Sequence, residues 1–455
     1  MESKFPVPPL LKEISEYFHK AGFSAYLVGG AVRDFFLKKK ASDWDIATDA
    51  PPQEVMRLFR RTIPTGIEHG TVTIIYKNKH IECTTFRTEA DYTDGRHPAA
   101  VSYAATIETD LARRDFTMNA VAVSLLDGTI VDPFNGRADI RAGRIQTVGS
   151  PIDRFLEDGL RPVRAVRFAA QLGFTVDTGT LQAIPQALHI TKKISIERFR
   201  EEFTKMLACP TPLTGLWLME STGLLNLFIP ELIECRGVGQ GSYHHFDVLE
   251  HSFLVCNACP AGTEHIHIRL AGLFHDIGKP VTRKEAADGS CTFYRHEAIS
   301  EKITRSIMRR LKYSNTEIEK TAHLVAEHMF HYDPSWTDAA VRRFVVRVGK
   351  ENIDDLFALR KADIFGLTGA YAEPNFLVEF TARIDRLLKE DGAYSLKDLA
   401  VNGKDLMAIG IPAGKCLGLV LHDLLETVLD DPAQNTKETL LPIASALYRR
   451  IQRFQ

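Results

Sequence analysis

The stretch "YLVGGAVRDFFLKKKASDWDIATDA", residues 26–50, decides the fold of the N-terminal part of this chain. An apolar run ends at Val28, two glycines follow, and an amphipathic segment then begins, which is the pattern of a strand, a tight turn and a helix. A second short strand is expected at 43–48, and residues 70–86 predict a hairpin that turns at 77–79. A small sheet with helices is therefore expected over residues 1–147.

The rest of the chain has a different pattern. From about residue 151 onward, apolar residues recur with helical spacing, interrupted by brief glycine or proline breaks. Stronger breaks near Gly149, at 237–242 and at 389–395 mark the expected domain boundaries. The sequence thus predicts the α+β class, with a small mixed sheet first and an all-helical remainder after it.

The composition is that of an ordinary folded protein. The 455 residues are too many for one core, and 45% hydrophobic with 25% charged residues excludes disordered and fibrous classes. A net charge of −2 gives no overall field that would attract nucleic acid. No run of about eighteen apolar residues occurs and the seven cysteines lack disulfide-type spacing, so a cytoplasmic protein without a membrane partner is expected. The CxxC pair, Cys256 and Cys259, is interpreted as a packed helix face.

Two acidic residues close together suggest a metal site. Residues two apart on a strand point to the same face, so Asp43 and Asp45 would project together, while Trp44 and Ile46 face the other side. Neighbouring carboxylates repel each other unless a cation intervenes, and oxygen ligands suit Mg²⁺. Glu82, on the predicted neighbouring strand, is either a third ligand or an ordinary exposed strand residue.

Basic and acidic residues suited to binding a nucleotide surround this acid pair. Gly29 and Gly30 allow the backbone to approach a phosphate closely, and Arg33 adds a positive charge, although a plain tight turn has the same signature. Further along, acid and arginine recur at intervals of three and are expected to face outward together, where they could read the Watson–Crick edge of cytosine or adenine. These residues are Asp158, Arg161, Arg164 and Arg167. The alternative is that Asp158 caps a helix whose first turn contains Pro162.

Six motifs in this order resemble the class II tRNA nucleotidyltransferase and bacterial poly(A) polymerase family. They are "LVGGAVRD", "DWD", "TTFR", "RRDFTMNA", "EDGLRPVRAVRF" and "ERFREEF", and the segment 401–429 is similar to the C-terminal part of the CCA-adding branch. The resemblance implies a polymerase-beta-like nucleotidyltransferase head over 1–147 and a helical neck and body over 148–236. A domain at 237–385 and a helical tail at 386–455 would follow.

The resemblance also implies an activity and roles for particular residues. The family adds C, C and A to the 3′ end of tRNA from CTP and ATP without a nucleic-acid template. DNA is not an expected partner. Asp43 and Asp45 would bind Mg²⁺, Gly30 and Arg33 the triphosphate, and Arg114 the nucleotide. Asp158 and Arg161 would select the base, with Arg164 and Arg167 nearby.

Histidines and aspartates in the helical half form a second candidate metal site. They are His251, His275, Asp276, His296, His328 and Asp363. Imidazole and carboxylate ligands suit divalent metals that activate water. The set resembles the HD metal-dependent phosphohydrolase superfamily, which implies a divalent transition metal such as Ni²⁺, Mn²⁺, Co²⁺ or Fe²⁺. The pairs His244 with His245 and His265 with His267 are interpreted as solvated positions.

Several functions remain open from the sequence. An enzyme that adds only A, one that adds only CC, and a poly(A) polymerase are alternatives within the family; residues 87–116 resemble a flexible loop that CC-only members lack. A different class is an HD phosphohydrolase whose head is a degenerate RNA-binding module. A nucleotide sensor fits less well, since its hydrolase would be expected first in the chain. The sequence leaves the oligomeric state open.

Overall fold

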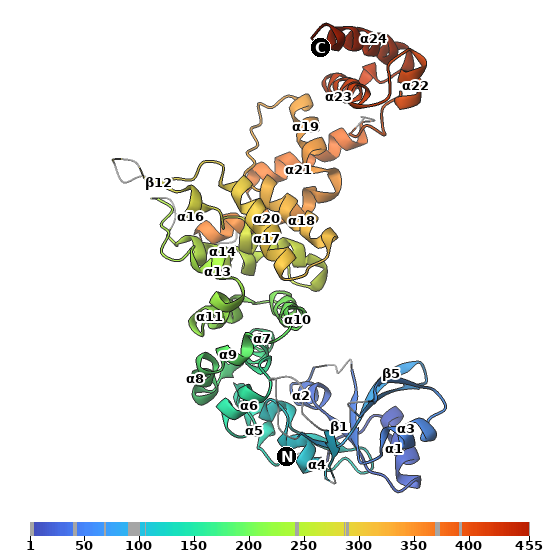
Figure 1. The fold of residues 1–455 in the computed structure, drawn as a ribbon, viewed down its shortest axis with the longest axis vertical. Coiled ribbons are helices and arrows are strands. Elements are labelled where there is room, and N and C mark those ends of the chain that lie inside the picture. The colour runs from blue at the N-terminus through green and yellow to red at the C-terminus, as the bar shows by residue number, and fades with distance from the viewer. Residues whose placement is uncertain are drawn as a thin grey trace. The chain divides into compact units, whose positions relative to one another are not determined.

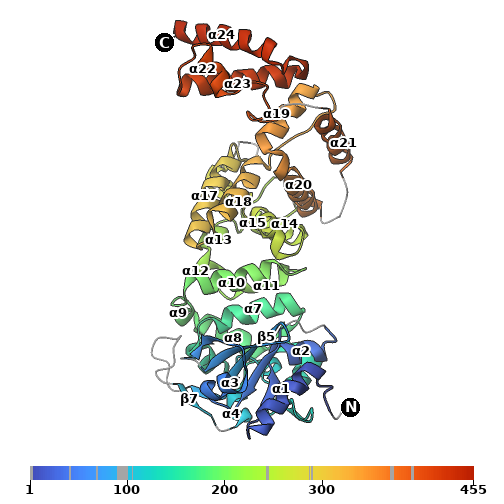
Figure 2. The same cartoon turned by 90° about the vertical axis from the view of Figure 1, so that its right-hand side faces the viewer.

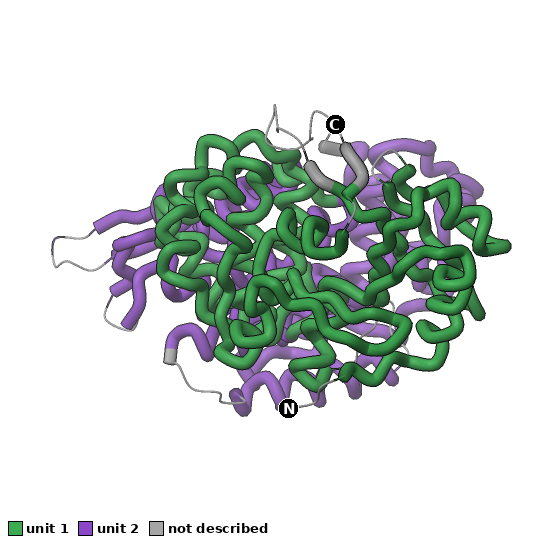
Figure 3. Tube along the Cα trace, turned by 90° about the horizontal axis from the view of Figure 1, so that it is seen from below, with its two compact units in different colours: residues 1–234, 261–266, 310–313 green, residues 235–260, 267–309, 314–455 purple. Residues whose placement is uncertain are grey.

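The computed structural model describes residues 4–39, 43–67, 70–89, 101–104, 106–241, 245–285, 287, 291–368, 374–390 and 394–454. These residues form two compact units (Figure 3). Unit 1 comprises residues 1–234, 261–266 and 310–313, and unit 2 comprises residues 235–260, 267–309 and 314–455.

Unit 1 begins with a mixed sheet of seven strands, drawn in blue to teal in Figure 1. The strands are β1 (Ala25–Val28), β2 (Asp45–Thr48), β3 (Thr62–Gly66), β4 (Thr71–Tyr76), β5 (Lys79–Thr85), β8 (Ala122–Ser124) and β9 (Ile130–Val131). Their order is β3-β4-β5-β2-β1-β8-β9, with β2 parallel to β5 and the other neighbours antiparallel. The small mixed sheet predicted from the sequence is therefore confirmed.

The predicted hairpin is also present, as β4 and β5. Lys77 and Asn78 connect the two strands and have φ angles of 46° and 61°. Positive φ at both central residues matches the right-handed twist of the paired strands, which explains the tight turn at this point.

Apolar residues on alternate sides of the strands build two cores, one on each face of the sheet. Leu27 and Ile46 belong to one core, and their neighbours Val28 and Ala47 to the other. The first core also takes residues from α1 (Pro9–Lys20), α2 (Gly30–Phe36) and α3 (Pro52–Leu58), and the second takes Leu111 from α4 (Ile107–Ala112). Further short elements are β6 (Arg87–Glu89), β7 (Val101–Tyr103), η2 (Thr117–Asn119), α5 (Gly136–Ala142) and β10 (Arg144–Ile145).

The remainder of unit 1 is helical, with one short exception. Its helices are α6 (Pro151–Glu157), α7 (Arg161–Leu172), α8 (Thr178–Gln186), α9 (Leu188–Thr191), α10 (Ile196–Leu207), α11 (Leu213–Ser221), α12 (Leu224–Phe228) and α13 (Pro230–Ile233). Figure 2 shows α7 beside α10 and α11. The exception is β11 (Thr175–Val176), which pairs in parallel with β10, so the prediction of an all-helical remainder is wrong here. The chain reverses at Gly173 (φ 69°), and β-branched residues then extend beside Ile145.

Unit 2 is mainly helical. Its elements are α14 (Val248–Ala258), α15 (Ile266–Phe274), α16 (Lys279–Thr282), β12 (Lys284–Glu285), β13 (Cys291–Thr292), α17 (His296–Arg310), α18 (Asn315–Glu327), α19 (Asp338–Val348), η4 (Lys350–Asn352), α20 (Ile353–Thr368), α21 (Asn375–Lys389), α22 (Gly403–Ala408), α23 (Lys415–Asp430), η5 (Pro432–Gln434) and α24 (Lys437–Phe454). The short helix η3 (Thr263–His265), which precedes α15, belongs to unit 1. The two-residue strands β12 and β13 pair with each other and are a second departure from the all-helical prediction.

Two apolar cores stabilise unit 2. Phe344, Phe357 and Phe380 pack in the first. Leu424 and Leu440 belong to the second, formed by α22, α23 and α24, which lie together in Figure 2.

The cysteines of the CxxC pair belong to the packed interior. Cys256 and Cys259 are buried free thiols, which confirms their interpretation as a packed helix face. Among the helices that the structure describes, none combines the length and apolar character needed to cross a bilayer.

Candidate functional sites

Unit 1 contains a strongly polar cavity of about 510 Å³. Seven of the residues with roles predicted from the sequence line it: Gly30, Arg33, Asp43, Asp45, Arg114, Arg164 and Arg167. The other lining residues are Gly29, Ala31, Asp34, Asp115, Asn119, Phe168, Gln171 and Lys205. Segments from the sheet, from the 114–119 turn and from α7 and α10 thus meet at one place.

The two acids lie at one edge of this cavity. Asp45 is the first residue of β2 and Asp43 precedes the strand, while Trp44 and Ile46 pack into the core on the opposite face, as the alternation predicts. Burial raises the pKa of Asp45, with the charges of Glu82 and Asp43 acting in the same direction and Arg114 against them. A nearby cation stabilises the ionised form of a carboxylate that is buried beside other carboxylates. The residues present therefore fit a divalent metal.

The Gly29 turn brings the backbone close to charged side chains. Gly29 has φ 71° and ψ −136°, a conformation that only glycine adopts readily. A side chain built there would begin 3.3 Å from Arg114 Nη1 and 3.5 Å from Asp45 Oδ2. Glycine is therefore favoured at position 29 for two reasons: its backbone angles, and the space that Arg114 and Asp45 occupy beside it.

A Gly29→Ala substitution is expected to impair the cavity more than the fold. The backbone strain should cost about 1–3 kcal/mol, and the added methyl group should push Arg114 away from Asp45. We expect a raised KM for nucleotide in steady-state assays of nucleotide addition. Gly22→Ala is the matched control, because Gly22 also has positive φ (83°) but its side chain would meet nothing within 4 Å. Equal kinetic effects of the two substitutions would contradict this prediction.

A chain of hydrogen bonds connects two arginines of the cavity, Arg33 and Arg164. Arg33 Nη1 donates to Asn119 Oδ1 (2.9 Å), Asn119 Nδ2 donates to Asp115 Oδ1 (3.1 Å), and Asp115 Oδ2 accepts from Arg164 Nε (2.8 Å). Burial opposes ionisation of Asp115, but Arg164 and Asn119 outweigh it and lower its pKa to about 2. Asp115 and Asn119 had no role in the sequence prediction, although the motif "RRDFTMNA" contains both.

Asp158 and Arg161 are not among the described residues that line the cavity. Asp158 accepts hydrogen bonds from Arg198 Nη2 (3.0 Å) and from the Leu160 backbone N–H (3.0 Å). Arg161 Nη1 donates to Glu157 Oε2 at 2.6 Å. Each predicted base-reading group is thus engaged with its own partner of opposite charge.

The predicted outward-facing row of one acid and three arginines is wrong in part. Asp158 precedes α7, so it does not share the face of that helix, and the N-cap residue is Leu160 rather than Asp158. Arg161 and Arg167 are buried, because acidic residues on α6 and α10 neutralise them; Arg167 Nε donates to Glu202 Oε2 at 2.6 Å. Pro162 does lie in the first turn of its helix, as predicted.

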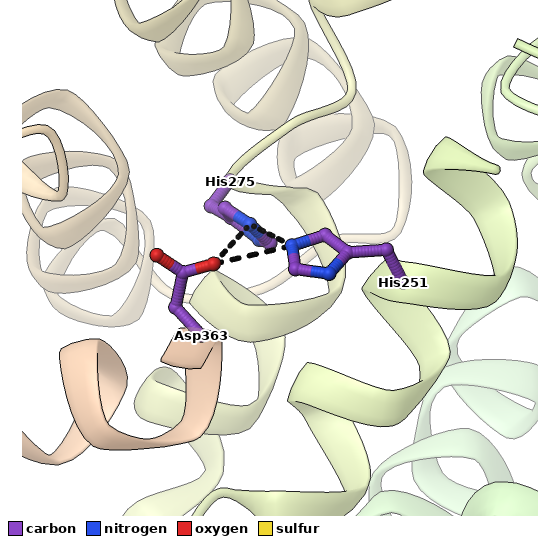
Figure 4. A group of neighbouring side chains, drawn as sticks. All are labelled: His251, His275 and Asp363. Atoms are coloured by element: carbon purple, nitrogen blue, oxygen red, sulfur yellow. Dashed lines mark hydrogen bonds and ion pairs between the residues drawn. The ribbon is translucent and has the colours of Figure 1, made fainter. Parts of the chain in front are cut away.

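Unit 2 contains the second candidate site, a pocket of about 780 Å³ lined by all six predicted ligands. The ligands form two groups whose donor atoms lie within 4.8 Å of one another: His251, His275 and Asp363, and Asp276, His296 and His328. Figure 4 shows the first group, in which side chains from three different helical segments point toward one another. His251 Nε2 lies 3.2 Å from both His275 Nε2 and Asp363 Oδ1.

Asp276 lies between the two groups of ligands. Its Oδ2 is 3.2 Å from His275 Nε2, and its Oδ1 is 3.1 Å from His296 Nε2. Burial acts to raise the pKa of Asp276, but the charges of His275 and Lys279 outweigh burial and hold the pKa well below its usual range. Burial lowers the pKa of His328 to about 3, which leaves a neutral imidazole. Buried ionised carboxylates beside histidine nitrogens are a donor set that fits two divalent metals.

The protonation of His275 bears on how metal would enter. Burial acts to lower its pKa, but Asp276 and Asp363 outweigh burial and raise the pKa to about 10. Metal binding to the His275 imidazole would therefore displace a proton from it.

Among the described histidines of the two remaining pairs, one is buried although a solvated position was predicted for it. His245 is exposed and His265 is partly exposed, in accord with the prediction, and His244 lies outside the described residues. His267 is buried instead, because its Nε2 pairs with Asp355 Oδ2 at 2.6 Å and so ties α15 to α20. A partner 88 residues away cannot be seen in the local pattern.

Gly366 on α20 leaves space for one of the predicted ligands. A side chain there would begin 3.0 Å from His251 Nδ1 and 2.5 Å from Val255 Cγ2. Gly366→Ala should therefore displace His251 and weaken divalent metal binding by about tenfold or more, measured by competition with a chelating dye. Gly418→Ala is the control, since this helical glycine has open space around it. Unchanged metal affinity in the Gly366→Ala protein would contradict the prediction.

Comparison with known proteins agrees with this architecture. Residues 25–146 match the profile "Poly A polymerase head domain", 173–235 match "Probable RNA and SrmB- binding site of polymerase A", and 291–444 match tRNA nucleotidyltransferase domain 2. The CCA-adding enzyme of Levilactobacillus brevis is 46% identical over 433 residues, which are 95% of this chain and 96% of that protein. That of Limosilactobacillus fermentum is 32% identical over 447 residues, 98% of this chain and 97% of the relative.

A solved structure gives the same result. The crystal structure of the Bacillus stearothermophilus CCA-adding enzyme in complex with CTP superposes with a TM-score of 0.74 at 30% identity and covers 99% of this chain and 100% of that chain. Head fold, cavity and relatives together define a nucleotidyltransferase. The chain belongs to the family of CCA-adding enzymes, which confirms the family resemblance of the motifs and the α+β fold class. The HD interpretation of unit 2 stays a prediction.

Proposed function

We propose that this chain adds C, C and A to the 3′ end of tRNA from CTP and ATP, without a template. The cavity carries the proposal, since it joins Asp43 and Asp45 to four arginines in a chain that is 46% identical to a CCA-adding enzyme over 433 residues. The relative solved with CTP supports CTP as a substrate. The reaction would take place in the cytoplasm.

The carboxylates and arginines of the cavity suit the metal ion and the triphosphate that such a reaction uses. Asp43 and Asp45 would hold Mg²⁺, which when bound activates the RNA 3′-hydroxyl and neutralises the departing pyrophosphate. Gly30 and Arg33 would bind the triphosphate, and Arg114 the nucleotide. Arg33 is oriented by Asn119 and Asp34 in advance, so little side-chain entropy is lost when a phosphate binds.

Base selection is assigned to Asp158 and Arg161, with Arg164 and Arg167 nearby. Each carboxylate oxygen has two lone pairs, so Asp158 can accept from the exocyclic amine of cytosine or adenine while it keeps its bond to Arg198. Arg161 Nη1 donates to Glu157 and to the Arg154 carbonyl oxygen, and Nη2 donates to the Arg113 carbonyl oxygen. The second N–H of Nη2 and the Nε–H are the donors left for a base. The pairing that the structure shows would hold both groups in place.

One experiment separates this function from its alternatives. Three tRNAs, one without CCA, one without the final A and one complete, are incubated with the protein, Mg²⁺ and both CTP and ATP, with CTP alone and ATP alone as controls, and product lengths are read on a gel. CCA addition extends the first by three nucleotides and the second by one. Extension of only the second indicates an A-adding enzyme, arrest after CC a CC-adding enzyme, and long tails a poly(A) polymerase. No extension of any tRNA would refute the proposal.

We also propose that residues 237–385 of unit 2 are an HD-type phosphohydrolase domain that holds two divalent transition-metal ions. The two ligand groups that share the carboxylate of Asp276 favour this interpretation. Hydrolysis is tested with 2′,3′-cyclic phosphates and Ni²⁺, Mn²⁺, Co²⁺ or Fe²⁺. Hydrolysis without any tRNA extension would favour the alternative in which the head only binds RNA. No hydrolysis with every metal would refute the phosphohydrolase.

The division into four parts is likewise a proposal. A head at 1–147, a neck and body at 148–236, an HD domain at 237–385 and a tail at 386–455 agree with the change of unit after residue 234. The separate apolar core of α22, α23 and α24 supports a distinct tail.

A further inference from the structure

Asp110 is a buried acid that lies behind the nucleotide cavity and is not among its described lining residues. It stands on α4, and the next two arginines follow it by three and four positions, which places all three side chains on one side of the helix end. Arg113 Nε donates to Asp110 Oδ1 at 2.9 Å, and Arg114 Nη2 donates to Asp110 Oδ2 at 3.2 Å. One carboxylate thus holds two guanidinium groups.

Arg114 connects Asp110 to the reacting side of the cavity. Its Nη1 lies close to the Gly29 turn, beside Asp45, and it donates to the Asn119 carbonyl oxygen at 3.5 Å. Its Nε is buried and has no hydrogen-bond partner in the part of the chain that the structure describes. The guanidinium is therefore held from behind by Asp110, while its other side faces the cavity.

The charge on Asp110 is what makes this arrangement rigid. The side chain of Asp110 is 1% exposed, so water screens the two ion pairs little. Burial alone would raise its pKa, but Arg113 and Arg114 outweigh burial and hold the pKa below its usual value. Removal of the charge would leave Arg114 facing Asp45 without a counter-charge behind it, and the guanidinium would turn toward that carboxylate.

We propose that Asp110 is a positioning residue that fixes the Arg114 guanidinium at the Gly29 turn for the incoming nucleotide. The inference rests on the proposed function, because Arg114 binds the nucleotide only if the cavity does. Asp110 itself need not touch the substrate, and its effect should pass entirely through Arg114.

The test compares Asp110→Asn with a matched control, Asp139→Asn. Asp139 is also a buried acid of the head, 2% exposed, ion-paired with Arg144 at 2.5 Å, and it is not among the described residues of the cavity lining. Both substitutions remove one buried charge, but only the first should raise the KM for CTP, by about tenfold, with a smaller change in kcat. Circular dichroism defines a temperature at which both variants are folded. If the Asp110→Asn protein does not fold, Asp110→Ser carries the same expectation.

A double-mutant cycle with Arg114→Ala separates positioning from general stability. If Asp110 acts through Arg114, Asp110→Asn should change the KM by less than about twofold in the Arg114→Ala background. Independent, multiplying effects, or an Asp110→Asn protein with the same KM as Asp139→Asn, would overturn the inference. If the unaltered protein itself adds no nucleotide, the proposed function has failed, and that result precedes any comparison of variants.

Discussion

An Asp45→Asn substitution is expected to lower the rate of nucleotide addition by at least about 10³-fold. The amide keeps the size of the side chain but removes the charge that a divalent ion requires at the edge of the cavity. The fold should survive the substitution. Burial and the charges of Glu82 and Asp43 raise the pKa of Asp45, so without a bound cation the negative charge of Asp45 destabilises the folded protein. Single-turnover extension of a tRNA without CCA measures the effect.

The control for this substitution is Asp49→Asn. Asp49 follows the same strand, and its Oδ1 accepts from the Ser24 backbone N–H at 2.8 Å, away from the cavity lining. We expect a small loss of stability and no loss of rate in this variant. An Asp45→Asn protein that extends tRNA as fast as the Asp49→Asn protein would exclude a metal role for the acid pair.

Glu82→Gln addresses the third ligand that the sequence left open. Glu82 stands directly opposite Asp45 in the register of β2 and β5, and its charge contributes to the raised pKa of Asp45. A rate loss as large as that of Asp45→Asn would make Glu82 a ligand, whereas an unchanged rate would leave it an exposed strand residue.

The local features of the head could be predicted from the sequence because they depend on neighbours in the chain. The strand before Gly29, the hairpin turn at Lys77 and Asn78 and the alternation of Asp45 with Ile46 follow from glycine, turn chemistry and the two-residue repeat of a strand. The six histidine and aspartate residues of unit 2 were identified by pattern, and the structure brings them together.

The environment of the charged residues could not be predicted in this way. Asp158 is bound by Arg198, 40 residues further on, and Arg164 by Asp115, 49 residues earlier. Spacing within one helix predicted that these groups would face outward, since it carries no information about which distant element supplies a counter-charge. His267 is buried for the same reason. Burial of a charged side chain is decided by the partner it finds in the fold.

The largest effect expected in unit 2 is the loss of metal on substitution of Asp276. Because its two oxygens face different ligand groups, Asp276→Ala should abolish tight binding of both ions, whereas His328→Ala should leave the group of His251, His275 and Asp363 able to bind one. Metal content per chain after dialysis, measured by mass spectrometry, distinguishes two, one and no ions.

His267→Gln provides the matched control for these variants. It alters a buried histidine of the same unit that pairs with Asp355 and belongs to neither ligand group, so metal content should stay at two ions per chain. Loss of metal in this control would mean that the site responds to general destabilisation of the helices. Equal metal content in the Asp276→Ala and unaltered proteins would refute the two-metal centre. Unchanged tRNA extension in the Asp276→Ala protein is also expected, because the ligands for nucleotide addition lie in unit 1 and those for this centre in unit 2.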